Sequence, residues 1–417
     1  MLVKIDKLVH GGQGLGMTQD GKKVFVWGAL QGEEVEVLIT KNKKDFAEGF
    51  AEKIIKPSAQ RINTLKADDI ELSTQPLKIM SYDAELIAKQ QIVQEIFSRE
   101  HIVLPEFNMQ TAGSVDKYRN KVEFSFWGDD QGIHYAHYLR ASHRKIKLPY
   151  PYNSLVFEGM SKYAGDLLKD LNELDIRAGD LKSVIIRSEN PASTTKKVGS
   201  ALFVKTDKFP KIQTSNIVVY YSNPKSPASV ATKKLYANGT TDLSDTLLNV
   251  ELKYDVMSFF QVNLPVFELA LKSIKALTKT ATTKIDMYSG VGAIGIPIGN
   301  SKALIELDEN NVFMARKNAA GLPIEVIQTS SEKALEYVKK EICLIVDPPR
   351  AGLHKYLVQR ILGERPKQVV YLSCNPATQA RDIKILLDGG YTLEGFNGYN
   401  FFPRTPHIET LANLVIQ

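Results

Sequence analysis

The chain has 417 residues, of which 43% are hydrophobic and 24% charged, a composition typical of a soluble protein with two or three domains. Its formal net charge of +6 permits a polyanionic partner without demonstrating one. Two cysteines are too few for a disulfide framework or a multi-thiolate metal or iron–sulfur site. We find neither a signal peptide nor a membrane-spanning run, so we expect a cytoplasmic protein with no membrane partner.

The pattern of residues 1–57 predicts a small OB-like β-barrel. Apolar and polar residues alternate over 2–9, 22–27, 33–40 and 49–55, and Asp20-Gly21 is a strong hairpin dipeptide. The glycines between positions 11 and 16 are spaced like those of a dinucleotide-binding loop, but a short strand follows them instead of a helix, so we reject that motif. Barrels of this kind often hold oligonucleotides.

Residues 58–250 predict a mixed α+β central domain. Apolar residues recur at helical spacing over 82–100, and strand patterns follow at 121–127, 183–187, 201–205 and 217–221. The sequence indicates no internal repeat.

A basic and aromatic segment lies within this domain, at residues 117–147. It holds seven basic residues and three acidic ones, interleaved with aromatic side chains. Cations position a phosphate backbone and aromatic rings stack on unpaired bases, so the mixture suits single-stranded or looped RNA. The alternative is a solvated sheet face whose aromatic rings lie in the core. The three histidines of the segment alternate with aromatic residues and have no carboxylate or thiolate at ligand spacing, so we expect no metal there.

Residues 251–417 alternate apolar strand patterns with helix-like segments, which predicts a doubly wound parallel sheet. The strand patterns lie at 284–288, 303–307, 325–328, 342–347 and 368–373. The predicted fold class is therefore α/β, with a Rossmann-like C-terminal domain preceded by the barrel and the mixed central domain.

The first of these C-terminal strands leads into a glycine turn. Gly290, Gly292 and Gly295 satisfy the G-x-G-x-x-G spacing, which lets a backbone turn tightly and approach a ligand closely. Glu306, at the end of the next strand, is placed to accept hydrogen bonds from ribose hydroxyls. This fingerprint fits NAD as well as S-adenosylmethionine, and a glycine turn that serves packing alone is the other alternative.

Asp347 ends a third apolar strand and is followed by Pro348 and Pro349. A buried strand thus delivers a carboxylate into a rigid turn, where it can face a bound ligand. The Asp-Pro-Pro sequence resembles the substrate-side motif of base-modifying methyltransferases. An aspartate that only forms the turn is the alternative.

Cys374 lies where an apolar run, Val369 to Leu372, breaks into Asn375-Pro376. Enzymes of the α/β class carry their chemistry at the carboxyl ends of such strands, so this cysteine is a candidate nucleophile. The alternative is a small buried side chain, as most free cysteines are. Cys343 lies within an apolar run, and we expect it in the core.

Five ordered motifs together resemble the RNA 5-methyluridine methyltransferases that use S-adenosylmethionine. The barrel resembles the TRAM domain of that family, and the segment from Lys117 to Lys121 resembles its RNA-facing segment, so the similarity covers nearly the whole chain. The motifs are Ser258-Phe259-Phe260-Gln261-Val262-Asn263, the turn from Asp286 to Gly292, Asp347-Pro348-Pro349-Arg350-Ala351-Gly352-Leu353, Leu372-Ser373-Cys374-Asn375-Pro376 and Pro406-His407-Ile408-Glu409-Thr410.

The resemblance implies a role for each matching residue. Uracil C5 is too weak a nucleophile to take a methyl group unaided, so a thiolate first adds at C6 and a base later removes the C5 proton. Cys374 would be that nucleophile and Glu409 that base. Cofactor contacts are implied for Gln261, Tyr288, Gly290, Gly292, Glu306, Asp347 and Ser330, and RNA contacts for Lys117, Arg119, Asn120 and Lys121.

The chain departs from the family in three places. Ser330 stands where relatives often carry Asp or Asn beside the adenine, and Ala293 replaces a commonly polar loop position. Many relatives bind an iron–sulfur cluster through cysteines after the barrel and in the central domain, whereas residues 61–82 and 140–152 of this chain contain none. We therefore expect no cluster, with packing in its place.

Three functions remain open from the sequence. The first is transfer of a methyl group to C5 of a uridine in structured RNA, with 23S ribosomal RNA favoured over transfer RNA because the barrel adds a binding surface suited to a large folded target. The second is methylation of an exocyclic base nitrogen, for which Asp347 suffices. The third is a non-catalytic RNA-binding or RNA-folding module. The sequence indicates no obligate protein partner.

Overall fold

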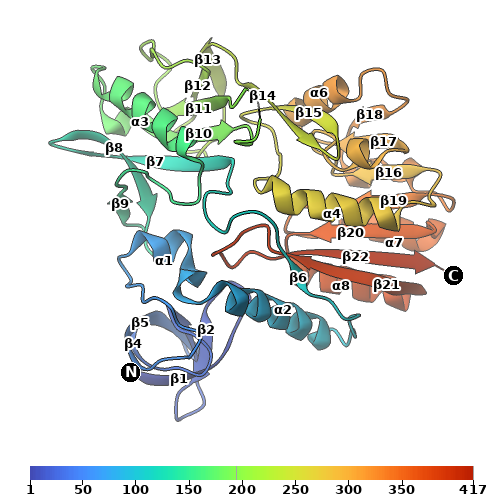
Figure 1. The fold of residues 1–417 in the computed structure, drawn as a ribbon, viewed down its shortest axis with the longest axis horizontal. Helices are drawn as coiled ribbons and strands as arrows, with labels where there is room; N and C mark the ends of the chain where they lie inside the picture. The colour runs from blue at the N-terminus through green and yellow to red at the C-terminus, as the bar shows by residue number, and fades with distance from the viewer. Residues whose placement is uncertain (194, 417) are drawn as a thin grey trace.

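The computed structural model describes residues 1–193 and 195–416, and the chain forms three regions that meet near the middle of the molecule (Figure 1). No helix among these residues is both long and apolar enough to span a membrane.

The N-terminal region is a closed barrel with the strand order β1-β2-β3-β5-β4, which confirms the predicted fold of this part. Its interior is filled by the alternate side chains of the strands, among them Val3, Ile5, Val24 and Val35. The strands are β1 (Leu2–Leu8), β2 (Gly14–Met17), β3 (Lys23–Trp27), β4 (Glu34–Asn42) and β5 (Phe46–Lys56).

A helical connection leads out of the barrel. It contains α1 (Ile70–Thr74), the 3-10 turn η1 (Pro76–Ile79) and α2 (Tyr82–Arg99). Glu33 of the barrel, which is fully buried, accepts a hydrogen bond of 2.6 Å from Arg61 Nε. Because a buried charge is costly unless it is paired, this ion pair fixes the connection against the barrel.

The central region is a seven-stranded sheet with α3 (Glu158–Asn172) packed on one face. The sheet order is β13-β12-β11-β10-β7-β8-β9. The strands are β7 (Lys121–Asp129), β8 (Gly132–Tyr138), β9 (Lys145–Lys147), β10 (Leu181–Ser188), β11 (Val198–Val204), β12 (Ile217–Tyr221) and β13 (Lys233–Asn238), with the 3-10 turn η2 (Ala178–Asp180) before β10.

The basic and aromatic segment supplies β7, β8 and β9 of this sheet. Phe124, Phe126 and Tyr135 are buried in its core, whereas Trp127 and Tyr138 are 44% and 49% exposed. Most of the aromatic rings therefore serve packing, as the sheet-face alternative predicts, and two remain open to solvent.

The C-terminal region is an eight-stranded, mostly parallel sheet of order β18-β17-β16-β19-β20-β22-β21-β6. It confirms the predicted doubly wound α/β fold. The strands are β6 (Met109–Gln110), β16 (Lys284–Met287), β17 (Ser301–Glu306), β18 (Glu325–Gln328), β19 (Cys343–Val346), β20 (Gln368–Ser373), β21 (Tyr391–Tyr399) and β22 (Glu409–Ile416), and β22 runs antiparallel to its neighbours. A hairpin of β14 (Asp242–Leu247) and β15 (Val250–Asp255) precedes it.

Helices cover both faces of this sheet. Apolar side chains of α4 (Leu264–Leu277), α5 (Gly295–Ile298) and α6 (Glu309–Asn318) pack on one face. Those of α7 (Lys355–Glu364), α8 (Pro376–Asp388) and α2 pack on the other, with the short turns η3 (Ser331–Lys333) and η4 (Leu335–Tyr337) between β18 and β19. Cys343 is 2% exposed in the core of the first face.

Two elements that precede the central sheet join the C-terminal sheet. The strand β6 pairs with β21 in parallel, and α2 packs against α8. The division into domains 1–57, 58–250 and 251–417 remains a prediction, and these contacts join its second and third parts closely.

Arg140 connects the two segments that lack cluster cysteines. Its Nε donates to Leu72 O at 2.8 Å, its backbone N–H donates to Ser73 Oγ at 2.8 Å, and its guanidinium lies 4.2 Å from the ring centre of Trp27. Among the described residues, no group of three or more His, Cys, Asp or Glu side chains could hold a metal ion.

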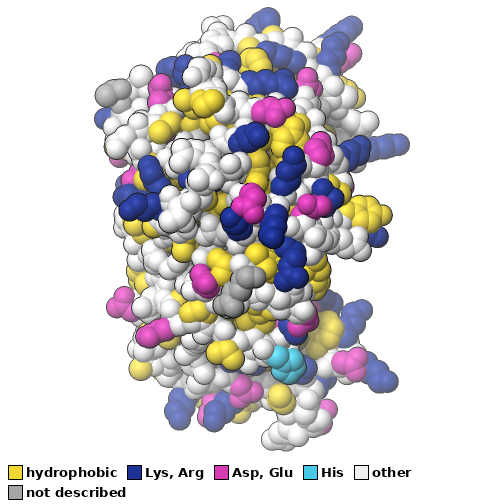
Figure 2. Space-filling model, turned by 90° about the vertical axis from the view of Figure 1, so that its right-hand side faces the viewer, with side chains coloured by type: hydrophobic (Ala, Val, Ile, Leu, Met, Phe, Trp, Pro, Cys, Tyr) yellow, Lys and Arg dark blue, Asp and Glu magenta, His cyan; other side chains and the backbone are white. Residues whose placement is uncertain are grey.

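Figure 2 shows the end of the molecule that lies at the right of Figure 1. On this end, lysine and arginine side chains are mixed with acidic ones and with small hydrophobic areas. The strands β7, β8 and β9 lie at the opposite side of Figure 1. A search for an RNA surface therefore turns to the middle of the molecule, where the three regions meet.

Candidate active site

The carboxyl ends of the parallel strands gather the candidate residues at one edge of the C-terminal sheet. Glu306 ends β17, Asp347 follows β19, and Cys374 follows β20. Because β22 is antiparallel, its first residue, Glu409, lies at the same edge. One strand of reversed direction thus brings a carboxyl group to the nucleophile.

A cavity of about 640 Å³ opens at this edge. Seven of the predicted site residues line it: Gln261, Tyr288, Glu306, Ser330, Asp347, Cys374 and Glu409. The structure thus brings the predicted nucleophile, the predicted base and most of the predicted cofactor residues into one space. Gly290 and Gly292 lie in the turn behind it, and the predicted RNA residues lie outside its lining.

Cys374 and Glu409 continue the ladder between β20 and β22. The last pair in the register is Ser373 with Thr410, so the next residue on each strand faces the other. Residues directly opposite in an antiparallel pair have Cα atoms about 4.5–5.5 Å apart. Gln379 Nε2 donates to Tyr371 O at 2.9 Å and Thr410 Oγ1 donates to Gln379 Oε1 at 2.7 Å, which holds both strands at this point.

Burial and mutual repulsion control the charges in the cavity. Burial raises the pKa of Glu409 well above its usual range, and the neighbouring Asp347 raises it further. Burial raises the pKa of Asp347 to about 7. Burial, Glu409 and Asp347 together raise the pKa of the Cys374 thiol to about 12, while Arg350 opposes them. The site without a ligand is therefore a thiol beside two carboxyl groups that hold protons readily.

Arg350 and His407 also belong to the site, although the sequence gave no reason to assign them a role. Both line the cavity, and Arg350 Nη2 lies 3.3 Å from His407 Nδ1. Burial, then Arg350, lowers the pKa of His407 to about 4, so the imidazole is neutral at physiological pH. Each lies inside one of the five motifs, and that position was the signal that could have identified them.

The glycine turn has the geometry of a cofactor-binding loop. Gly292 has φ +84°, and a Cβ there would lie 2.6 Å from Ile296 Cδ1 and 3.0 Å from Leu304 Cδ1, so no larger residue fits. Gly290 has φ +55° and donates its N–H to Glu306 Oε2 at 2.8 Å. Asp286, fully buried, accepts from Gly295 N–H at 2.8 Å and fixes the start of the turn.

The residues present fit S-adenosylmethionine. The Glu306 carboxylate is held by the N–H groups of Gly290, Leu307 and Asp308 at the end of β17, the place where a ribose diol is bound in such folds. Phe259, 62% exposed, and Ile305 supply apolar walls, and Tyr288 OH accepts a hydrogen bond of 2.6 Å from Ser331 Oγ. Ser330 lines the same cavity, as its predicted place beside the adenine requires.

Asn120 and Arg187 hold the segment that carries Gln261. Asn120 is 1% exposed, and its Nδ2 donates to Gln261 O at 3.0 Å, so the structure places it beneath the cavity. Arg187 is fully buried and donates to the carbonyls of Ser258 and Phe260. The central sheet thus fixes one wall of the cavity, and an RNA contact by Asn120 remains a prediction.

The other predicted RNA residues differ in exposure. Lys117 is exposed, with φ +53°, and Arg119 is half-buried. Lys121 is also half-buried, and burial, then Arg187, lowers its pKa to about 8. Their contacts with RNA remain predictions too.

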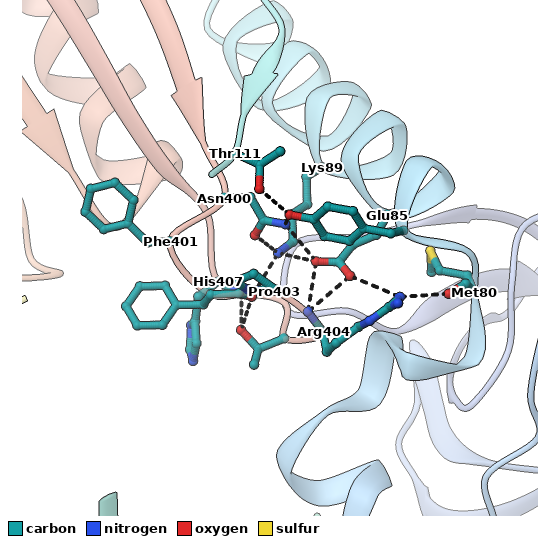
Figure 3. A network of polar contacts seen from close by, with 12 residues as sticks. Met80, Glu85, Lys89, Thr111, Asn400, Phe401, Pro403, Arg404 and His407 are labelled. Atoms are coloured by element: carbon teal, nitrogen blue, oxygen red, sulfur yellow. Dashed lines mark hydrogen bonds and ion pairs between the residues drawn. The ribbon is translucent and has the colours of Figure 1, made fainter. Parts of the chain in front are cut away.

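A buried polar network holds the loop of residues 400–408, which ends at Glu409 (Figure 3). Lys89 Nζ of α2 donates to Asn400 Oδ1 at 2.7 Å and to Phe402 O at 3.2 Å. Glu85 accepts from Asn400 Nδ2 at 3.0 Å and from the Arg404 backbone N–H at 3.0 and 3.1 Å. Helix α2 therefore holds the loop that leads into the predicted base.

Comparison with known proteins identifies the two ends of the chain. The TRAM domain family matches residues 1–51, and the tRNA (Uracil-5-)-methyltransferase family matches residues 335–415. The latter range contains Asp347, Cys374 and Glu409. The protein is an RNA methyltransferase of the uracil-C5 family.

Full-length relatives of this uracil-C5 RNA methyltransferase have the same extent. An uncharacterized RNA methyltransferase of Enterococcus faecalis is 29% identical over 450 residues, which cover 99% of this chain and 96% of the relative. An uncharacterized RNA methyltransferase of Fusobacterium nucleatum is 26% identical, with 98% and 94% covered. The prediction of S-adenosylmethionine as the methyl donor is confirmed at the level of the family.

A solved structure of similar fold spans the whole methyltransferase. The tRNA (uracil-54, C5)-methyltransferase of Pyrococcus abyssi, crystallised with S-adenosyl-L-homocysteine, matches with a TM-score of 0.78, 24% identity and 100% of both chains covered. This likeness confirms the arrangement of barrel, central sheet and doubly wound sheet.

Proposed function

We propose that this enzyme transfers a methyl group from S-adenosylmethionine to C5 of a uridine in structured RNA through a covalent bond between Cys374 and C6. The observation that carries the proposal is the placement of Cys374 and Glu409 across one strand ladder in one cavity. A thiol and a carboxyl group on the two sides of a planar base are what addition and elimination at C6 and C5 require.

The residues would act in a fixed order. The Cys374 thiol loses its proton as its sulfur bonds to C6, and the electron pair of the C5–C6 double bond makes C5 nucleophilic. Bound S-adenosylmethionine supplies a methyl group on a positively charged sulfur. Glu409 then accepts the C5 proton, the electron pair of that C–H bond restores the double bond, and the Cys374 thiolate leaves.

The raised pKa of Glu409 supports its role as the proton acceptor. A carboxylate of ordinary pKa is a weak base, whereas one whose pKa approaches neutrality holds the C5 proton more tightly after transfer. Gln261, Glu306, Ser330 and Asp347 would hold the cofactor on one wall, with Tyr288 and the Gly290 to Gly292 turn behind it. Lys117, Arg119, Asn120 and Lys121 would contact the RNA or support that contact.

A covalent adduct tests the proposal directly. RNA containing 5-fluorouridine should form a stable protein–RNA adduct with the wild-type enzyme, because fluorine at C5 prevents removal by a base. Cys374→Ala should abolish both the adduct and methyl transfer, while Cys343→Ala should keep both. Full transfer by Cys374→Ala, or labelled product identified by nucleoside analysis as an N-methylated base, would support the exocyclic-nitrogen alternative instead.

We also propose 23S ribosomal RNA as the substrate, on the ground that the barrel enlarges the surface for a folded target. The Pyrococcus abyssi enzyme, which has a similar fold over its whole length, is described as acting on tRNA, so the test must separate the two. RNA from cells that lack this enzyme, incubated with the protein and tritiated S-adenosylmethionine, should carry label in the 23S fraction. Label in the transfer RNA fraction alone would refute the ribosomal target.

A further inference from the structure

A second cavity, of about 350 Å³, lies beside the catalytic one and shares His407 with it. We call it the flanking groove. Its walls come from the central sheet, from the segment before η1 and from the loop that holds Thr405 and Pro406. The lining residues that matter below are Arg119, Glu123, His137, Arg140 and His407.

The arginines of the flanking groove are not neutralised within the protein. Neither Arg119 nor Arg140 belongs to an ion pair among the described residues. Arg140 is anchored through Leu72 and Ser73, as described above. The Nε of Arg119 is buried and has no hydrogen-bond partner among the described residues, although buried N–H groups almost always have one.

The histidines of the groove respond to this charge. Burial, then Arg119, lowers the pKa of His137, with Arg140 adding to the effect and Glu123 opposing it. Arg119 also contributes to the lowered pKa of His407. Glu123 is the acidic side chain that lines the groove, and its carboxylate accepts a hydrogen bond of 2.6 Å from Ser229 Oγ. The groove therefore carries an excess of positive charge.

The groove is continuous with the place of the target base. The Arg119 guanidinium lies 5.9 Å from the ring centre of Phe402, and Phe402 lines the catalytic cavity. A strand whose base enters the catalytic cavity through the His407 side thus passes the arginine. A planar guanidinium with a free N–H matches the oxygens of a phosphodiester in both shape and charge.

We propose that the flanking groove binds a backbone phosphate of the RNA, next to the nucleotide whose base enters the catalytic cavity, and that Arg119 makes the contact. The proposal rests on the proposed function only in taking that base to be the target uridine. An acidic peptide is a different ligand that the same charge could attract, and the test below separates the two.

The experiment measures the affinity of the full-length protein for an oligouridine RNA over a series of salt concentrations. Arg119→Gln should weaken binding about tenfold and lower the slope of log K against log salt by about 0.7, the value for one lost contact to a single strand. Arg99→Gln is the matched control, because Arg99 is 64% exposed at the other end of α2, and it should leave the slope unchanged. Unchanged affinity for S-adenosylmethionine shows that each variant is folded, and Arg119→Lys should retain the slope.

A second measurement follows His137 by NMR. Bound phosphate should raise the pKa of His137 in the wild-type protein by neutralising the guanidinium beside it, and Arg119→Gln should remove that response. An unchanged salt slope, an unchanged His137, or competition by polyglutamate that depends on Arg119 as strongly as RNA binding does would each overturn the proposal. None of these measurements requires methyl transfer, so failure of the Cys374 adduct and failure of the groove are separate results.

Discussion

Glu85 and Lys89 form an ion pair of 2.9 Å whose side chains are 0% and 1% exposed. Both belong to the first part of α2, and both hold the loop that ends at Glu409. Breaking a buried pair leaves one charge without its partner, which costs more than the pair itself contributes. The pair therefore couples the helix that follows the barrel to the catalytic edge of the sheet.

We expect Glu85→Ala to lower the free energy of unfolding by about 3–5 kcal/mol, because it leaves Lys89 buried and unpaired. Burial already lowers the pKa of Lys89, and Glu85 is the group that opposes this. Urea denaturation measures the loss. Glu95→Ala on the same helix is the control, since Glu95 pairs with exposed Lys7 and Arg99 and should cost under about 1 kcal/mol. Equal losses in both variants would contradict the buried role of the pair.

The stability of the protein should fall between about pH 5 and pH 8 through Asp347. Burial raises its pKa to about 7 in the folded protein, above that of an unfolded aspartate, so the folded state favours the protonated form. Its contribution is complete below about pH 4 and is lost as pH rises through about 7. Asp347→Asn should flatten the profile by on the order of 1–3 kcal/mol, measured by thermal unfolding across pH. A wild-type profile as flat as that of the variant would contradict the raised pKa.

The single-turnover methylation rate should change in the opposite direction over the same pH range. Glu409 must be ionised to accept the C5 proton, and both burial and Asp347 favour its protonated form. The rate should therefore increase about tenfold per pH unit on the acid side and level off at alkaline pH. Glu409→Gln should lower the rate by at least about a hundredfold at all pH values. A rate that does not depend on pH between 5 and 8 would argue against Glu409 as the base.

Alkylation of Cys374 should depend on the charge of the molecule in the cavity. Two carboxyl groups help to raise the pKa of this thiol to about 12, so a positive charge beside them should lower it. We expect iodoacetamide to label Cys374 faster with S-adenosylmethionine, which carries a sulfonium, than with S-adenosylhomocysteine, which does not. Cys343, buried in the core, is the internal control and should stay unlabelled, as measured by mass spectrometry of its peptide. Equal labelling with both molecules would contradict the electrostatic argument.

Gly292→Ala should weaken S-adenosylmethionine binding at least about tenfold, because its Cβ would overlap Ile296 and Leu304 behind the turn. Gly299→Ala is a matched control, since Gly299 also has positive φ, +73°, but has open space around its Cβ position. It should cost only the backbone strain, about 1 kcal/mol of stability. Calorimetry gives the affinities, and similar losses in both variants would mean that backbone strain, and not the overlap, sets the effect.

The catalytic edge could be predicted from sequence because its residues follow apolar strands. Asp347 and Cys374 each come directly after a run with the period and composition of a buried strand, and parallel strands end at one edge. Glu409 was harder, since only the resemblance to a family pointed to it. Its place depends on the antiparallel direction of β22, which the residues 409–416 do not reveal by themselves.

Other features depend on contacts between distant parts of the chain. Glu85 and Asn400 are 315 positions apart, and nothing in either local pattern indicates that they meet. Asn120 lies in a segment rich in cations, so the sequence favoured a surface role, whereas its side chain is buried under Gln261. The flanking groove likewise forms only where three segments converge.

Gly12 of the barrel shows how closely these regions depend on one another. It has φ +91°, and a Cβ at this position would lie 2.8 Å from Pro406 Cβ, one residue before His407. The barrel is therefore a mechanical support of the loop that leads to Glu409, in addition to any surface it offers to RNA. An enzyme truncated before residue 58 would lose this support, so its slower turnover would report a displaced loop as well as a weaker grip on the substrate.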